Sequence, residues 1–315
     1  MKAVRIERIT PAEDVCLVDV PIPETRSGWV LIKVMAFGMN HSEKILRLNE
    51  IEADYISKPV IPGIECVGLI EDPSDTGFSK GDKVIAMMGG MGRSFDGSYA
   101  EYVLLPEHHV FKVDTDIPWD ELASVPETYL TAWGSLFECL QLKKGETLLI
   151  RGATCALGYA AIDIAKALGC KIIGTTHRES KLGLLNGADL AVLDDGRISE
   201  KGLDVDKALD LVGPKSLIDT LRTVKKGGIV CDTGILGGVF ELDGFDPIKD
   251  IPNGVYLTGY FSNYPTKETV DSIFAFIREN DLHPKYSLCF RFDDIREACI
   301  ALDEGKAQGK IVVVI

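Results

Sequence analysis

The residues best suited to hold a ligand follow an apolar run that ends at Arg151. The chain there reads Gly-Ala-Thr-Cys-Ala-Leu-Gly, and an apolar face with helical spacing begins directly afterwards. A turn that binds a dinucleotide usually has the pattern G-x-G-x-x-G, whose last glycine lets the helix pack closely on the strand. Ala153 and Cys155 replace two of these glycines but are small, and Gly158 keeps the close contact. The helix N-terminus offers N–H groups to a pyrophosphate. The candidate contacts are Ala153, Thr154, Cys155, Ala156, Leu157 and Gly158.

The end of the next apolar run indicates which nucleotide would bind. A site that prefers NAD has an acidic residue there, which holds the ribose 2′-hydroxyl. This chain has Thr176, His177 and Arg178 instead, with Lys181 one turn further. A carboxylate would repel a 2′-phosphate, whereas Arg178 and Lys181 would pair with it. We therefore expect NADPH, with an ordinary solvated helix start as the alternative.

Apolar runs with glycine stops predict the elements around these residues. Strands over 147–151, 171–176 and 190–193, with a helix from 156 to 168 and a shorter one over 181–186, give a βαβαβ unit. We expect further strands over 207–211, 228–233 and 255–261, a helix over 216–224, and a helical segment over 120–140 in which Pro126 marks a break or a start. The first 120 residues contain short strands, one of them over 98–104, that suggest a mostly antiparallel, barrel-like module.

The predicted domains are 1–120 for the N-terminal part of a catalytic domain, 121–262 for a nucleotide-binding domain, and 263–315 for a return to the catalytic domain. The 315 residues suffice for two cores, and 46% hydrophobic with 26% charged residues is typical of globular proteins. The net charge of −14 argues against partners such as nucleic acid or an anionic membrane. We expect neither a membrane-spanning segment nor a signal peptide, and eight scattered cysteines without a C-x-x-C pair predict reduced, buried thiols in a cytoplasmic protein.

Seven segments carry a likeness to a known family. They are VLIKVMAFGMN (30–40), PVIPGIECVGLIE (59–71), GDKVIAM (81–87), GSYAEYVLLP (97–106), SVPETYLTAWGSL (124–136), GATCALG (152–158) and GKIVVVI (309–315). In this order and spacing the chain resembles the medium-chain dehydrogenase/reductase superfamily, specifically its zinc-independent quinone oxidoreductase branch. The resemblance implies an α/β fold, in which a Rossmann doubly wound parallel sheet is inserted into a GroES-like, mostly antiparallel β-barrel catalytic domain.

The zinc-binding members of that superfamily offer a test of metal chemistry. Where they carry a cysteine ligand this chain has Asn40, and where they carry a histidine before glutamate it has Ile64 before Glu65. A structural zinc lobe needs four closely spaced cysteines, yet none lies between Cys66 and Cys139. We therefore expect no metal.

The same resemblance implies the remaining coenzyme contacts. Asn40 would lie beside the nicotinamide, and Thr131 would touch its ring or ribose. The further contacts implied are Gly234, Ile235, Leu236, Tyr260, Phe261, Ser262 and Lys310. Each has a plain alternative: Asn40 as a turn residue, Thr131 as a helical hydroxyl bonded to its own backbone, and Lys310 as an exposed lysine before a strand.

An acceptor would meet residues of the connection that follows Asn40, with Arg47 and Tyr55 as its candidate side chains. In relatives that reduce enones or enoyl thioesters, a tyrosine in a comparable loop is a proposed proton donor, but Tyr55 could equally be a packing residue. His108 and His109 follow one another in a predicted strand, so we expect them to point to opposite faces and not to share a site.

These observations favour a metal-free, NADPH-dependent reductase of a quinone or a related activated carbonyl compound. An enone or 2-enoyl thioester reductase with Tyr55 as donor is the nearest alternative, and a non-catalytic NADPH-binding redox sensor is the alternative of another class. The apolar run 255–261 predicts a strand at a sheet edge, and pairing of that edge with its twin predicts a homodimer.

Overall fold

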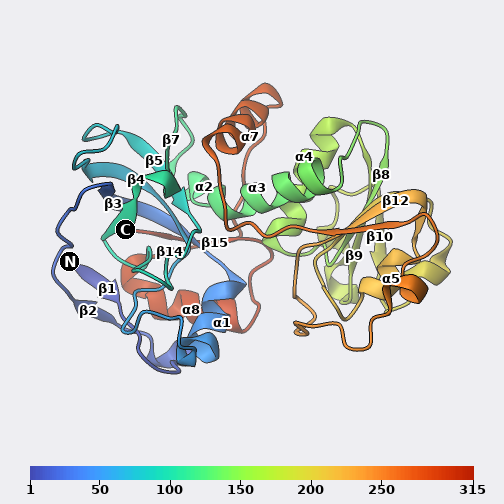
Figure 1. Cartoon of the computed structure of the whole chain (residues 1–315), viewed down its shortest axis with the longest axis horizontal. Helices are drawn as coiled ribbons and strands as arrows, with labels where there is room; N and C mark the ends of the chain where they lie inside the picture. The colour runs from blue at the N-terminus through green and yellow to red at the C-terminus, as the bar shows by residue number, and fades with distance from the viewer. The chain divides into compact units, whose positions relative to one another are not determined.

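The computed structural model describes all residues from 1 to 315, and the chain divides into two compact units. Unit 1 contains Met1–Leu130 and Asn263–Ile315, and unit 2 contains Thr131–Ser262. Both ends of the chain therefore lie in unit 1 (Figure 1). The assignment of a catalytic role to one part and a nucleotide-binding role to the other stays a prediction.

Unit 1 is built on a mostly antiparallel sheet around one long strand. β3 (Trp29–Met39) pairs with β4 (Glu65–Asp72), β6 (Tyr102–Pro106) and β15 (Ile311–Val314), all antiparallel. The sheet order is β14-β15-β3-β4-β5-β7, with β6 paired to β3 off this path. The other strands of this unit are β5 (Lys83–Met87), β7 (Val110–Lys112), β14 (Leu288–Arg291), and the separate pair β1 (Lys2–Val4) and β2 (Leu17–Asp19). Residues 310 to 314 thus come to lie beside the end of β3, from which they are separated by most of the chain.

Helices and buried apolar side chains complete unit 1. The helices are α1 (His41–Leu48), α2 (Trp119–Leu122), α7 (Lys267–Glu279), α8 (Ile295–Asp303) and the first part of α3 (Pro126–Trp133). Phe37 stacks on Tyr99 at 4.7 Å between ring centroids and meets Phe292 edge-on at 5.9 Å. This core fixes the end of β3, directly before Asn40 and α1.

Unit 2 contains a parallel sheet of six strands in the order β10-β9-β8-β11-β12-β13. Its strands are β8 (Thr147–Arg151), β9 (Lys171–Thr176), β10 (Leu190–Leu193), β11 (Val205–Asp210), β12 (Val224–Asp232) and β13 (Tyr256–Gly259). In chain order this is 3-2-1-4-5-6, the order of the doubly wound dinucleotide-binding fold. The predicted fold class is therefore confirmed, and β13 lies at one edge of the sheet.

The first helix of unit 2 begins and ends where the sequence indicates. α4 (Ala156–Leu168) is capped at its start by the Cys155 thiol, which accepts a hydrogen bond from the Gly158 N–H at 3.4 Å. It ends at Gly169, whose φ of +84° is the left-handed conformation that closes many helices. α4 packs on β8 and β9, and α5 (Leu217–Leu221) packs on β11 and β12 (Figure 1). A short helix, α6 (Pro247–Asp250), precedes β13.

Three local predictions were wrong in detail. The helical segment over 120–140 is split into α2, α3, which begins at Pro126, and a π-helix over Gly134–Cys139. The short helix over 181–186 is a 3-10 helix, Glu179–Leu184. The strand expected over 98–104 is β6, which begins at Tyr102, because residues before it turn to pack against the backbone of residues 62 and 63.

None of the helices combines the length and the apolar character that a bilayer-spanning segment needs.

None of the eight cysteines forms a disulfide, but the prediction that they are buried holds only for Cys66, Cys231 and Cys299. Cys16, directly before β2, and Cys289, on the edge strand β14, are exposed.

Candidate functional site

The turn between β8 and α4 has the close packing that a dinucleotide-binding turn requires. A Cβ atom on Gly158 would lie 2.3 Å from the Ala153 carbonyl oxygen, so only glycine fits there. The Gly152 N–H donates to the Thr175 hydroxyl at 3.1 Å, and the Ala153 N–H donates to the Thr175 carbonyl at 2.8 Å. Thr154 and Thr176 join their hydroxyls at 3.1 Å. The predicted residues Ala153 to Gly158 therefore form one turn, pinned to the end of β9.

Two cations lie close together just beyond β9. Burial lowers the pKa of the Lys181 ammonium, and the nearby charge of Arg178 lowers it further. Arg178 donates its Nε to the His177 ring at 3.2 Å, and no carboxylate pairs with either cation. The nearby Cys155 side chain has the opposite, smaller effect and raises the pKa of Lys181. The cation pair therefore lies beside the β8–α4 turn. The arrangement leaves two positive charges available to an anion.

Buried charges behind the turn hold the carboxyl ends of the strands. The Arg151 guanidinium makes two hydrogen bonds to Asp194, at 2.7 and 2.9 Å, and one to Asp219 at 2.8 Å. Asp210 lies between Arg151 and Asp232 in the register of the sheet. Burial and the Asp210 charge raise the pKa of Asp232 to about 7, and the Oδ1 atom of Asp232 is buried without a hydrogen-bond partner. Asp232 ends β12 and leads into the next predicted contact segment.

The segment after β12 folds back onto the end of β11. The Gly234 N–H donates to the Asp210 carbonyl at 3.3 Å, and the Leu236 N–H donates to the Leu211 carbonyl at 3.1 Å. Ile235 is half-buried, whereas Leu236 is exposed. The predicted contacts after β13 follow the neighbouring strand end. The Tyr260 N–H donates to the Asp232 carbonyl at 3.3 Å, while Phe261 is exposed and Ser262 half-buried. Unit 2 therefore brings all its predicted coenzyme residues after 150 to the carboxyl edge of one sheet.

In unit 1, Lys310 is not the exposed lysine that one interpretation of the sequence allowed. Its side chain is 2% exposed, and its Nζ lies 2.6 Å from Asn40 Oδ1, 2.5 Å from Glu65 Oε1 and 3.9 Å from Glu127 Oε2. Asn40 also donates its Nδ2 to Glu65 Oε1 at 2.8 Å. Together with Glu43, these residues form what we call the Lys310 cluster.

The Lys310 cluster holds a fixed internal charge. Burial would lower the pKa of Lys310, but the Glu65 and Glu127 carboxylates outweigh it and raise that pKa. Glu43 is fully buried, and burial together with the Glu65 charge raises its pKa to about 7. Its Oε2 accepts the Asn40 N–H at 2.8 Å, and its Oε1 accepts the Ile64 N–H at 3.2 Å. The cluster thus fixes Asn40 through its main chain and both ends of its carboxamide.

The residues of this cluster do not form a zinc site. A catalytic zinc takes three protein ligands, usually histidine, cysteine or carboxylate, and keeps a fourth position open. The Glu65 carboxylate already forms an ion pair with the Lys310 ammonium and accepts a hydrogen bond from the Asn40 amide. Nowhere in the chain do three or more histidine, cysteine, aspartate or glutamate side chains gather in a way that could hold a metal ion.

Two other predicted catalytic residues, Arg47 and Thr131, are not members of this cluster but follow its members Glu43 and Glu127 by four residues on α1 and α3. Arg47 is buried on α1 and bonds Asp303 Oδ1 at 2.6 Å and the Thr10 carbonyl at 2.9 Å. Its contacts join three segments of unit 1, so its visible role is structural. Thr131 is 4% exposed and lies at the end of α3, where its carbonyl accepts the Ser135 hydroxyl at 2.7 Å.

Tyr55 lies on the surface of unit 1, with 63% of its side chain exposed. Its hydroxyl donates to Glu50 Oε1 at 2.6 Å, and Arg93 holds the Glu50 carboxylate from the other side at 2.7 Å. The hydrogen bond to Glu50 raises the pKa of Tyr55. The phenol is therefore exposed but held in one orientation by a charged partner.

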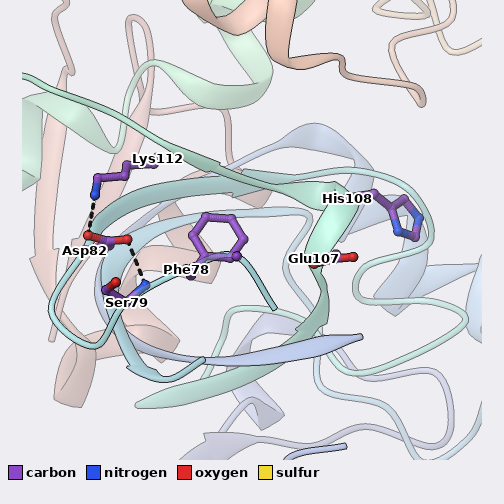
Figure 2. Close-up of a pocket in the computed structure, with 7 residues that line it drawn as sticks. Phe78, Ser79, Asp82, Glu107, His108 and Lys112 are labelled. Carbon is purple, nitrogen blue, oxygen red and sulfur yellow. Dashed lines mark hydrogen bonds and ion pairs between the residues drawn. The ribbon is translucent and has the colours of Figure 1, made fainter. Parts of the chain in front are cut away.

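The prediction that His108 and His109 point to opposite faces was wrong. They lie in a 3-10 helix, Glu107–His109, before β7, and their ring centroids are 4.1 Å apart. His109 is buried, whereas His108 lines a surface pocket of unit 1 with Phe78 and Lys112 (Figure 2). No predicted site residue lines this pocket.

The comparisons with known proteins agree with this geometry. Residues 26–115 match the family model described as alcohol dehydrogenase GroES-like domain, and residues 186–313 match that described as zinc-binding dehydrogenase. The chain is 32% identical to a human (Homo sapiens) quinone oxidoreductase over 256 residues, which cover 76% of this chain and 74% of that protein. The chain belongs to the medium-chain dehydrogenase/reductase superfamily, in its quinone oxidoreductase-like branch. It is therefore an oxidoreductase of that family.

Other proteins resemble the chain over more of its length. The solved quinone oxidoreductase of Coxiella burnetii has a TM-score of 0.84 and 25% identity, and the likeness covers 100% of this chain and 99% of that one. An acryloyl-coenzyme A reductase of Sulfurisphaera tokodaii is 25% identical over 96% of this chain and 97% of its own. A mycobacterial protein complexed with NADPH shares the fold, with a TM-score of 0.85 at 23% identity over 100% of both chains.

Sequence reasoning did not find every residue of these sites. Glu43 carries one available signal, because Asn40 and Glu43 have the spacing of a capping box before a helix. Glu127 and Glu50 carry none. Glu127 contacts Lys310, which is distant in the sequence. Glu50 contacts Tyr55 across a turn that the sequence alone does not define.

Proposed function

We propose that this protein is an NADPH-dependent reductase that transfers hydride to a quinone or a related activated carbonyl compound without a metal ion. The relationship to quinone oxidoreductases supports the reaction class. The observation that carries the coenzyme choice is the pair Arg178 and Lys181, two cations without a carboxylate partner beside a closely packed β8–α4 turn. In a chain of net charge −14, such a pair is suited to a 2′-phosphate.

The residues of unit 2 fit the coenzyme in kind. The Gly158 N–H of α4 donates to the Cys155 thiol, whereas the Ala156 and Leu157 N–H groups have no partner within the helix and can donate to the pyrophosphate, with the Thr154 hydroxyl beside them. Arg178, assisted by Lys181, would hold the 2′-phosphate through charge-assisted hydrogen bonds. Backbone groups of Gly234–Leu236 would orient the carboxamide, and Tyr260 to Ser262 would bound the nicotinamide. Thr131 would contact the same end of the coenzyme. NADPH supplies the hydride when bound.

The role that we propose for unit 1 rests on orientation. Asn40 uses Oδ1 to accept from Lys310 and one Nδ2 hydrogen to donate to Glu65, so one Nδ2 hydrogen remains for a ligand. Lys310 and Glu65 thereby position Asn40 and do not themselves need to touch the substrate. A quinone accepts hydride readily, so the reaction asks mainly for orientation and exclusion of water, which a rigid buried network can supply.

A substrate screen tests this function. Folded protein is mixed with 1,4-quinones and either NADPH or NADH, and the loss of absorbance of the reduced nicotinamide is followed. We expect turnover of quinones, with NADPH preferred. Tight binding of NADPH without turnover over a broad panel of acceptors would instead favour a non-catalytic redox sensor. The absence of any NADPH binding to folded protein would refute the proposal outright.

Two observations favour a second candidate, an enone or 2-enoyl thioester reductase. The likeness to the acryloyl-coenzyme A reductase covers nearly the whole chain, and Tyr55 presents an oriented, exposed phenol. If the protein reduces crotonyl-type thioesters through this phenol, Tyr55→Phe should slow that reaction and leave quinone reduction unchanged. Tyr286→Phe is the matched control, because the Tyr286 hydroxyl likewise donates to a carboxylate, that of Asp120 at 2.7 Å.

We propose further that the protein is a cytoplasmic homodimer joined at the edge strand. β13 ends the sheet of unit 2, and Tyr256 on it is 61% exposed. An uncovered edge offers its N–H and C=O groups to a second copy across a two-fold axis. Sedimentation equilibrium should give twice the mass of the chain, and a monomer at all concentrations would contradict this assembly.

A further inference from the structure

Unit 2 holds two cysteines on neighbouring elements that no part of the proposed reaction uses. Cys231 is buried on β12, and Cys139 is half-buried at the last position of the π-helix. All other cysteines of this unit lie elsewhere, at the turn before α4 and at the residue before β9. The question is what chemistry these two thiols can perform together.

A chain of side-chain contacts fixes the π-helix against the strand end. The Ser135 and Thr233 hydroxyls are 2.9 Å apart, and the Thr233 hydroxyl is 3.2 Å from the Cys231 Sγ. Cys139 follows Ser135 by four residues, so it lies on the same side of the helix about one turn later. The Cys139 Sγ donates to the Gly259 carbonyl on β13 at 3.4 Å. Because β13 pairs with β12 beside Cys231, both thiols come to the same place on the sheet.

Both thiols lie where β12 and β13 pair, Cys231 beside Thr233 and Cys139 against Gly259. The Cys139 side chain acts on Cys231 both as a hydrogen-bond partner and as a nearby charge, and it adds to the burial that raises the pKa of Cys231 to about 12. Both thiols also contribute to raising the pKa of the adjacent Tyr260 hydroxyl. Cys231 is thus a poorly reactive, buried thiol, whereas Cys139 is the member of the pair with access to solvent.

We propose that Cys139 and Cys231 form a redox-responsive pair that closes to a disulfide when the protein meets a hydroperoxide. The Cys139 sulfur, after losing its proton, attacks one peroxide oxygen; an S–O bond forms, the O–O bond breaks, and the leaving hydroxide takes a proton to become water. The Cys231 sulfur then loses its proton and attacks the Cys139 sulfur. The S–S bond forms, the S–O bond breaks, and a second water leaves. Two thiols and one hydrogen peroxide thus give one disulfide and two waters.

Closure of this pair would act on the coenzyme side of unit 2. It would tie the end of the π-helix to β12 two residues before Thr233 and would remove the Cys139 hydrogen bond to Gly259. The pair is independent of the proposed reductase activity, because its chemistry needs neither coenzyme nor acceptor. Its failure would therefore leave the proposed function untouched.

Peptide mapping under non-reducing conditions tests the pair directly. Trypsin releases Cys139 in residues 113–143 and Cys231 in residues 227–249, each with no other cysteine. After treatment of the full chain with hydrogen peroxide and alkylation of the remaining thiols, we expect these two peptides joined and lighter by two hydrogens, and separated again by dithiothreitol. Because the buried Cys231 must lose its proton, closure should be slow at neutral pH and severalfold faster as the pH rises.

Variants separate this pair from general oxidation. Cys139→Ser should abolish the joined peptides, and Cys231→Ser should leave a Cys139 sulfenic acid that dimedone traps. Cys170→Ser is the matched control, since Cys170 is also half-buried and donates to a backbone carbonyl, that of Lys143 at 3.3 Å; it should leave the joined peptides unchanged. A mixture of isotopically labelled and unlabelled protein should give no mixed pairs, because the bond lies within one chain.

Two results would overturn the proposal. In the first, Cys139 and Cys231 stay reduced while the exposed Cys16 and Cys289 become oxidised. In the second, Cys139 joins a peptide other than 227–249, or joins Cys231 of another chain in the isotope experiment. Either result can be obtained with the unaltered protein, so the test does not depend on the folding of a variant.

Discussion

The proposed nucleotide-binding edge of unit 2 and the Lys310 cluster of unit 1 use charge in opposite ways. Near the β8–α4 turn, the cations Arg178 and Lys181 face no carboxylate, and the contact groups are mainly backbone N–H groups and small side chains. In the Lys310 cluster, the ammonium lies 2.5 to 2.6 Å from Glu65 and Asn40, and the Lys310 and Glu65 side chains are almost fully buried. One region leaves its charges unsatisfied, and the other satisfies nearly all of them internally.

This difference teaches how the two regions would contribute to one reaction. Charges without partners can gain free energy from an anionic ligand, so the edge of unit 2 is suited to binding. A buried ion pair gains nothing from a ligand and costs free energy if it is broken, so the Lys310 cluster is suited to holding Asn40 in one orientation. Substitutions in unit 2 should therefore change affinity, and substitutions in unit 1 should change stability first.

The largest effect should come from breaking the buried ion pair. Lys310→Met leaves the Glu65 carboxylate buried without its cation, and loss of one partner of such a pair costs about 3–5 kcal/mol of unfolding free energy. Urea denaturation measures this loss. Lys267→Met is the control, because the Lys267–Asp271 pair on α7 is exposed and its loss should cost about 0.5 kcal/mol or less. Equal effects of the two variants would show that the cluster is not the stabilising unit described here.

Over-packing the nucleotide turn should come next. Gly158→Ala places a Cβ 2.3 Å from a backbone oxygen. Over-packing of this kind lowers the free energy of unfolding by about 1–3 kcal/mol. Because the turn moves as a whole, the affinities for NADPH and NADH should fall together in calorimetry. Gly183→Ala meets no heavy atom within 4 Å and should leave both affinities unchanged. Unaltered binding by the Gly158 variant would remove this turn from the proposed site.

The Glu43 carboxyl should make stability fall as the pH rises. Its pKa is about 7 in the folded protein and near 4.5 when unfolded, so between these values only the folded state retains the proton. Rising pH therefore lowers the free energy of unfolding by up to about 3 kcal/mol over this range. Above pH 7 this contribution is fully lost. Glu43→Gln should flatten this part of the pH profile of urea denaturation. Asp232→Asn is the parallel measurement for unit 2, because the pKa of Asp232 is also about 7. A Glu43 variant with the original slope would contradict the prediction.

The most selective effect should come from the exposed cations. Arg178→Ala should weaken NADPH by about 1–3 kcal/mol, the value of one or two charge-assisted hydrogen bonds, and leave NADH nearly unchanged. Titration calorimetry with both coenzymes gives the ratio. Arg197→Ala removes another exposed arginine of unit 2 and should affect neither. Equal losses for the two coenzymes would show that Arg178 does not meet a 2′-phosphate.

Much of unit 2 could be predicted because its elements are specified locally. The apolar runs of β8, β9 and β10 and the helix stop at Gly169 each lie within a few residues of the features that define them. The cations after β9 could be found for the same reason, since a short spacing places them at a strand end. The errors fell where two local structures compete, as at the π-helix over Gly134–Cys139 and at the 3-10 helix that brings His108 onto His109.

The sequence by itself determined the βαβαβ unit and the small residues of the β8–α4 turn, because each depends on residue type and short spacing. The expectation that Asn40 and Ile64 stand where relatives carry zinc ligands came from the family resemblance. Only the tertiary structure decided that Lys310 is a buried cation, since its partner Asn40 lies 270 residues away. The same holds for the thiol pair, which forms because a helix end and a strand pack together. Burial and partner choice are long-range properties, and no local pattern of residues contains them.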